Sequence, residues 1–74
     1  MNYLELIEQD KEKLGGTAVF KGTRVPIKNL FDYLEAGDNL KIFLDDFPTV
    51  TREQAIGILE LFKSKLLEEY EAAA

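Results

Sequence analysis

The chain has 74 residues and a net charge of −5, from 14 acidic and 9 basic residues, and it contains neither cysteine nor histidine. This composition excludes a disulfide framework and thiolate chemistry, and it removes the most common metal ligand and general acid–base. One domain of this size buries only about 60% of its unfolded surface, so we expect association with another chain to add stability. With no apolar run of ~18 residues and no secretory signal pattern, we expect a cytoplasmic protein without membrane contact.

Residues 1–25 are predicted to form a β arm with loops. The segment 17–20 favours a short strand, and Gly22 would turn it so that residues 23–25 return as a second short strand. Gly15 and Gly16 are a turn signal just before the first strand. We therefore expect a small, irregular β-hairpin or an extended arm at the N-terminus.

The segment 26–36 is predicted to be the first of three helices. Pro26 suits a first helical position because its missing N–H would be unpaired there in any case. Gly37 suits the left-handed position just after the helix. One apolar stripe follows at helical spacing, made of Ile27, Leu30, Phe31 and Leu34.

Two further helices are predicted at residues 40–46 and 51–71. Asn39 is a favoured N-cap for helix two, and Pro48 ends that helix. Thr51 and Gln54 have the spacing of a capping box at the start of helix three. A short helix, a tight turn and a longer helix form a helix-turn-helix, so we expect a mainly α, single-domain, three-helix bundle.

Residues 15–16 (Gly-Gly) and 21–27 (Lys-Gly-Thr-Arg-Val-Pro-Ile) resemble the signature of the domain-of-unknown-function 433 family. The resemblance continues through Gly37, Asn39, Leu44, the Asp-Phe-Pro of residues 46–48, and Thr51 with Glu53. It implies a homeodomain-like helical fold. It also implies an antitoxin-like protein that silences a PIN-like ribonuclease toxin encoded nearby, and that represses its own operon as a dimer.

A nucleic-acid surface is a second hypothesis. In a helix-turn-helix the start of the second helix enters the major groove, where Arg52 and Gln54 would read bases. Arg24 has two interpretations, a phosphate or carboxylate contact and a structural role, and we favour the structural one, with loop carbonyls or with Asp32 or Glu8 as partners. The full candidate set is Lys21, Arg24, Lys28, Lys41, Arg52 and Gln54.

A protein-binding surface on helix three is the leading hypothesis. This helix has more apolar positions than a small bundle can cover, and an exposed apolar patch is typical of an interface. The candidate contacts are Phe62, Leu66, Leu67 and Tyr70. Their partner would be the toxin or, in a third hypothesis, a second copy of the chain in a plain homodimeric module.

No catalytic, cofactor or metal site is predicted. The acidic pairs 45–46 and 68–69 are adjacent on helices, so their side chains point about 100° apart and do not converge. The glycines of residues 15–22 do not have the order of a phosphate-binding loop. We therefore expect a binding protein and not an enzyme.

Overall fold

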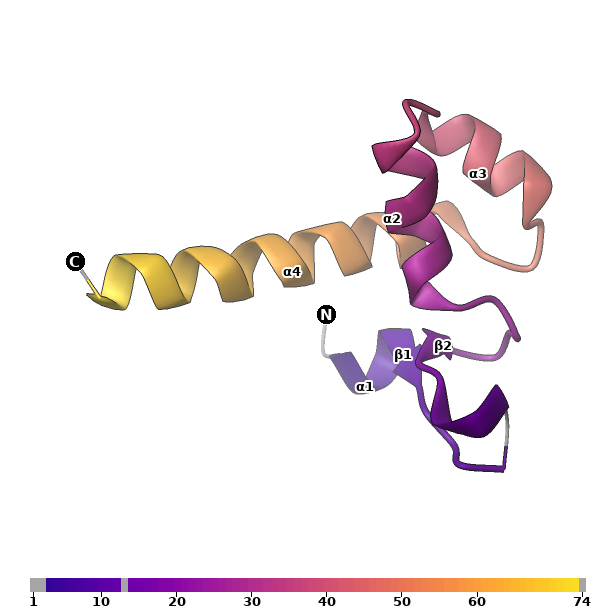
Figure 1. Ribbon diagram of the computed structural model, residues 1–74, viewed down its shortest axis with the longest axis horizontal. Coiled ribbons are helices and arrows are strands. Elements are labelled where there is room, and N and C mark those ends of the chain that lie inside the picture. Colours follow the sequence, from indigo (N-terminus) through magenta and orange to yellow (C-terminus); the bar gives the residue numbers. More distant parts are fainter. Residues whose placement is uncertain (1–2, 13, 74) are drawn as a thin grey trace.

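A computed structural model of the chain describes residues 3–12 and 14–73. Figure 1 shows a cluster of short elements from which one long helix projects. In chain order, the elements are α1 (Tyr3–Leu6), β1 (Ile7–Glu8), the 3-10 turn η1 (Leu14–Gly16), β2 (Val19–Phe20), α2 (Ile27–Glu35), α3 (Leu40–Asp46) and α4 (Arg52–Ala73). The predicted mainly helical domain with an N-terminal β-hairpin is confirmed.

The predicted second strand of the hairpin was placed wrongly. β2 pairs antiparallel with β1, which precedes it, in a register that joins Ile7 to Phe20 and Glu8 to Val19. Residues 23–25 form no strand, and the return of the chain is limited to a single bridge between Val19 and Pro26. The reason is Thr23, whose hydroxyl donates to the Phe20 carbonyl and accepts from the Val25 amide, so that it closes a tight turn.

Helix α2 begins one residue later than predicted and ends in the expected glycine. Pro26 is the N-cap and keeps an extended backbone (φ −61, ψ 138), because the bridge to Val19 holds it in line with the strand. At the other end Gly37 has φ +91 and its amide donates to the Leu34 carbonyl, while the Asp38 amide donates to Tyr33. This pair of bonds is the Schellman motif that closes a helix.

Both predicted caps of the last two helices are confirmed. The Asn39 side chain accepts from the Ile42 amide at 3.0 Å, which fixes the start of α3. At the start of α4 the Gln54 amide donates to Thr51 Oγ1 at 3.1 Å, and the Thr51 amide donates to Gln54 Oε1 at 3.0 Å. These reciprocal bonds form a complete capping box. Helix α4 begins one residue later than predicted, at Arg52, and continues two residues further, to Ala73.

One apolar core joins the hairpin, α2, α3 and the first turns of α4. The rings of Phe20 and Phe43 lie at its centre, 5.9 Å apart. Its buried members are Leu6, Phe20, Val25, Ile27, Leu30, Phe43, Val50, Ala55 and Ile58. Ile58 is the last core residue along the chain, so α4 continues for several turns beyond the part that the core holds in place.

Candidate binding surfaces

The C-terminal half of α4, residues 62–73, extends past the rest of the molecule and is called the arm below (Figure 1). Its large apolar side chains remain in contact with solvent. The exposed fractions are 44% for Phe62, 55% for Leu66, 46% for Leu67 and 71% for Tyr70. The structure therefore leaves uncovered all four residues that the sequence nominated for partner binding.

An apolar groove of about 590 Å³ runs along one side of α4 where the arm leaves the core. Its walls come from β1 on one side and α4 on the other. The lining residues are Ile7, Leu61, Phe62, Lys65, Leu66 and Glu69. Leu67 is adjacent to Leu66 in sequence but points about 100° away around the helix, and it is not part of the groove.

Phe62 anchors the base of the arm to α2. Its ring stacks on Phe31, with 5.1 Å between ring centres and 15° between ring planes. Phe62 therefore has a structural contact as well as an exposed edge, whereas Leu66, Leu67 and Tyr70 have no ring or polar contact with any other residue that the structure describes. Substitutions at these three positions report on binding more cleanly than substitutions at Phe62.

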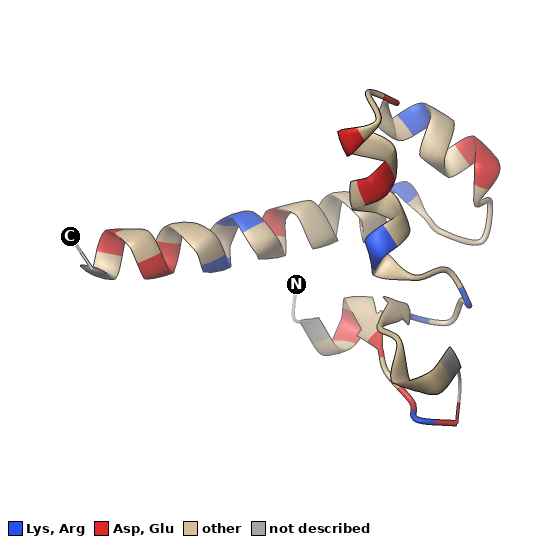
Figure 2. Ribbon diagram, viewed as in Figure 1, with Lys and Arg blue, Asp and Glu red and all other residues tan. Residues whose placement is uncertain are grey.

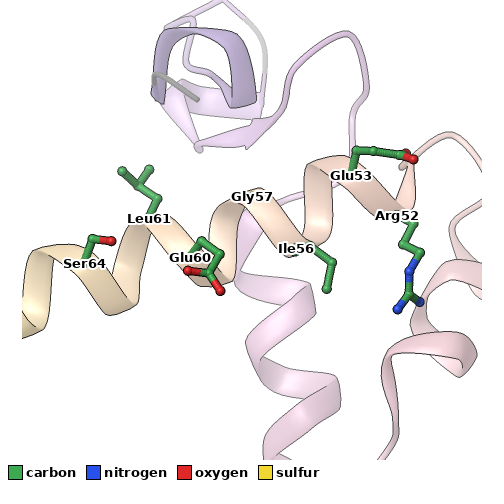
Figure 3. Close-up of a pocket in the computed structure, with 7 residues that line it drawn as sticks. All are labelled: Arg52, Glu53, Ile56, Gly57, Glu60, Leu61 and Ser64. Atoms are coloured by element: carbon green, nitrogen blue, oxygen red, sulfur yellow. The ribbon is translucent and has the colours of Figure 1, made fainter.

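A second hollow, of about 600 Å³, lies on α4 itself nearer the core, and Figure 3 shows it in close-up. In that view Arg52, Ile56 and Glu60 point to one side of the helix, and Glu53 and Leu61 point to the other. The hollow combines one cation with two carboxylates, which makes it a poor match for a phosphate backbone.

A third hollow, of about 960 Å³, brings together several segments that are distant in sequence, and the Glu8 carboxylate of β1 is part of its lining. Lys21, Arg24 and Pro26 come from the turn after β2, and Phe47 and Thr49 come from the turn between α3 and α4. The two cations nominated for nucleic acid in the N-terminal third therefore share one surface.

The Arg24 guanidinium has neither of the carboxylate partners that we expected. Asp32 pairs with Lys28 instead, and the Glu8 carboxylate accepts from the Gly22 amide at 3.2 Å. Among the residues that the structure describes, Arg24 forms no side-chain hydrogen bond or ion pair, and it is exposed. The contacts of Arg24 do not support the preferred structural interpretation, because the Thr23 hydroxyl and the Glu8 carboxylate, and not Arg24, bond the backbone of the turn.

The other basic candidates are spread over separate elements (Figure 2). Lys28 pairs with Asp32 at 2.5 Å and Lys41 pairs with Asp45 at 2.9 Å, each within its own helix. The hydrogen bond and charge of Asp32 raise the pKa of Lys28 above its ordinary value. Two of the nominated cations are thus already neutralised locally.

Gln54 is committed to the fold. Its oxygen accepts from the Thr51 amide and its Nε2 donates to the Lys21 carbonyl at 2.9 Å. Reading a base would require breaking both bonds. In the described part of the chain, no group of three or more acidic side chains is placed to hold a metal ion, and no helix there is long and apolar enough to cross a membrane.

A comparison with models of known protein families identifies the family of this chain. A family model described as "Protein of unknown function (DUF433)" matches residues 7–61, which is well over half of the chain. The chain belongs to the DUF433 family. No curated protein and no solved structure matches it.

The DUF433 match and the arm occupy different parts of the chain. The match includes both turns that line the 960 Å³ hollow, and it ends at residue 61. All four exposed partner-binding candidates lie beyond that residue. The arm therefore lies outside the part of the chain that the family model matches.

Sequence reasoning missed four members of the groove: Ile7, Leu61, Lys65 and Glu69. Lys65 and Glu69 carry a sequence signal, because they stand four residues apart on the helix face that also carries Phe62 and Leu66. Ile7 carries none, because only the pairing of β1 with β2 brings it beside α4.

Proposed function

We propose that this DUF433 protein is a small, non-catalytic, cytoplasmic binding protein of the antitoxin type. It would neutralise a PIN-like ribonuclease toxin by protein–protein contact through the arm. The observation that carries the proposal is the exposure of Leu66, Leu67 and Tyr70 on a helix that projects from the core. Large apolar side chains grouped in this way are typical of a protein interface.

The arm suits helix-in-groove recognition. Leu66 and Tyr70 are four residues apart and lie on one side of the helix, as the anchors of a docking helix do. Because α4 is already a helix anchored by its first turns, binding would not require the partner to order it. The acidic residues Glu68, Glu69 and Glu71 would complement the basic surface of an RNA-cleaving enzyme.

Co-expression with the protein encoded by the neighbouring gene tests the proposal. We expect a complex in a pull-down and restored growth when that neighbour is toxic. The variant Leu66→Gln/Leu67→Gln/Tyr70→Gln should lose both effects while keeping its melting temperature, because none of the three belongs to the core. Absence of a complex with the unaltered chain would refute the proposal.

Binding to operator DNA is a second proposal with narrower support. The observation in its favour is the hollow that Lys21 and Arg24 share, where two exposed cations could contact one phosphate strand. Three of the other candidates argue against DNA binding, because their side chains already form contacts within the fold: Gln54, Lys28 and Lys41. A gel shift on the upstream DNA, with Lys21→Gln/Arg24→Gln as the comparison, tests it: binding that is salt-sensitive and lost in the variant is the expected result.

A further inference from the structure

We propose that, in the absence of another protein, the groove side of the arm is occupied by the arm of a second copy of this chain, in an antiparallel pair. This inference rests on the proposed function in that it names a first occupant for the same surface. Three features of the arm support this pairing: the order of charges along the groove, the unpaired state of those charges, and the length of helix that projects past the core.

The groove has a charge pattern that complements itself. Lys65 and Glu69 line it together with Phe62 and Leu66, so that one cation and one anion flank an apolar centre, one helical turn apart. If two arms pack in opposite directions, the groove side of one helix faces the groove side of the other. Lys65 of one chain then meets Glu69 of the second chain. The two-fold symmetry repeats the contact, which gives two ion pairs around Leu66 and Phe62.

Both charges are available for such pairing. In the part of the chain that the structure describes, neither the Lys65 nor the Glu69 side chain forms a hydrogen bond or ion pair. Three other lysines pair within their own helices: Lys28, Lys41 and Lys63. The groove thus presents one cation and one anion of α4 for a contact between chains, next to side chains that still face water.

The length of the arm fits the antiparallel arrangement. A crossing at the level of residue 67 places residue 61 of one chain opposite residue 73 of the other. The overlap then covers about 18 Å of helix, most of which projects past the other elements. The rest of each chain lies beyond the overlap, so the two sets of short elements do not collide. A parallel pair would instead place both sets side by side and face Lys65 with Lys65.

Sedimentation velocity of the purified chain over a range of concentrations is the first test. We expect a dimer that dissociates in about the micromolar range, because the overlap is short compared with a standard interface. Leu66→Gln should raise the concentration at which half of the chains are dimeric by about tenfold or more. Leu67→Gln is the matched control, because Leu67 is the next residue but points away from the groove, and it should leave that concentration unchanged. A chain that stays monomeric up to millimolar concentration, or equal effects of the two variants, would overturn the inference.

Charge reversal tests the direction of the pair. Lys65→Glu and Glu69→Lys should each weaken self-association by roughly tenfold, because each replaces two attractive contacts by two repulsive ones. The double variant Lys65→Glu/Glu69→Lys should restore wild-type association, since the antiparallel contacts reform with exchanged partners. A double variant that is no better than the single variants would reject the antiparallel pairing.

The two proposals fail independently. Sedimentation uses the chain alone, whereas the pull-down uses the neighbouring gene product. A monomer that still captures that product would overturn the self-pairing and leave the proposed function in place. A dimer that does not capture that product would support the self-pairing and refute the proposed function.

Discussion

The side chain of Gln54 donates to the main-chain carbonyl of Lys21 at 2.9 Å, across 33 residues of sequence. The same side chain closes the capping box with Thr51. One residue thus fixes the start of α4 and also ties it to the turn that follows β2. This turn contains the Lys-Gly-Thr-Arg-Val-Pro-Ile segment that resembles the DUF433 signature. The hydrogen bond from Gln54 therefore joins that segment to the long helix.

Gln54→Ala should lower the free energy of unfolding by about 1–2 kcal/mol, because it removes both the cap and the tether. Gln54→Glu separates the two effects: it keeps an oxygen acceptor for the Thr51 amide but sets a carboxylate against the Lys21 carbonyl. We expect the free energy of unfolding of Gln54→Glu, measured by urea denaturation, to lie between that of wild type and that of Gln54→Ala. A Gln54→Glu chain as stable as wild type would show that the tether contributes nothing.

Gly57 provides the space in which α1 meets α4. A Cβ at this position would lie 2.9 Å from Leu6 Cδ2 and 3.2 Å from Leu6 Cδ1, and Leu6 is fully buried. Gly57→Leu should therefore destabilise the chain by about 1–3 kcal/mol through overpacking. Ser64→Leu, on the same helix but exposed, is the matched control and should change the unfolding free energy by less than about 0.5 kcal/mol. Equal effects would contradict the packing argument.

Gly37 holds a left-handed backbone, φ +91, that a Cβ disfavours, although nothing crowds the site. Gly37→Ala should cost roughly 1 kcal/mol, and Gly37→Asn should cost less because asparagine tolerates this conformation. For a domain of this size the alanine variant should melt about 4–8 °C lower. An alanine variant that melts at the wild-type temperature would show that the Schellman turn can rearrange at no cost.

The Tyr33 hydroxyl donates to Asp46 at 2.7 Å, which joins α2 to the end of α3. This hydrogen bond, with smaller contributions from burial and from the charges of Asp46 and Asp38, raises the pKa of Tyr33 above 10.0. Because the folded-state pKa is the higher one, the stabilisation is fully present below about pH 10 and is lost as the pH rises through that raised value.

A spectroscopic titration of tyrosine ionisation checks this prediction. Asp46→Asn should bring the pKa of Tyr33 back toward 10.0, since the anionic acceptor is gone. Tyr33→Phe should remove the high-pH transition from the titration and flatten the stability profile in that range. An unchanged transition in Asp46→Asn would exclude the hydrogen bond as its cause.

The caps and helical stripes could be predicted from sequence because they are local. Asn39, Thr51 and Gly37 act on backbone groups within a few residues, so their chemistry fixed the helix ends to within one or two positions. The strand pairing could not be predicted in the same way. Val19 and Phe20 were expected to pair forward with a second strand, but their strand partners are residues 7–8, and the forward pairing is limited to the bridge from Val19 to Pro26. Nothing in a two-residue strand encodes its partner.

The candidate surfaces divide along the same line. The apolar excess on α4 was visible in sequence, since helical spacing shows which positions a small core cannot reach. The groove could not be seen in the sequence, because it forms only when the fold brings Ile7 beside Leu61. The nucleic-acid candidates were selected by residue type alone. Sequence gave no means of seeing that Gln54 would be occupied by Lys21 and Thr51.

The last buried core residue of α4 is Ile58, while the exposed apolar residues of the arm begin at Phe62. Under the proposed function, folding and recognition would therefore be carried out by almost separate sets of residues. A substitution at Leu66 or Tyr70 would then change the binding preference without lowering the small free energy of unfolding. Such a molecule is free to acquire new partner preferences one residue at a time, because each intermediate sequence remains a folded protein.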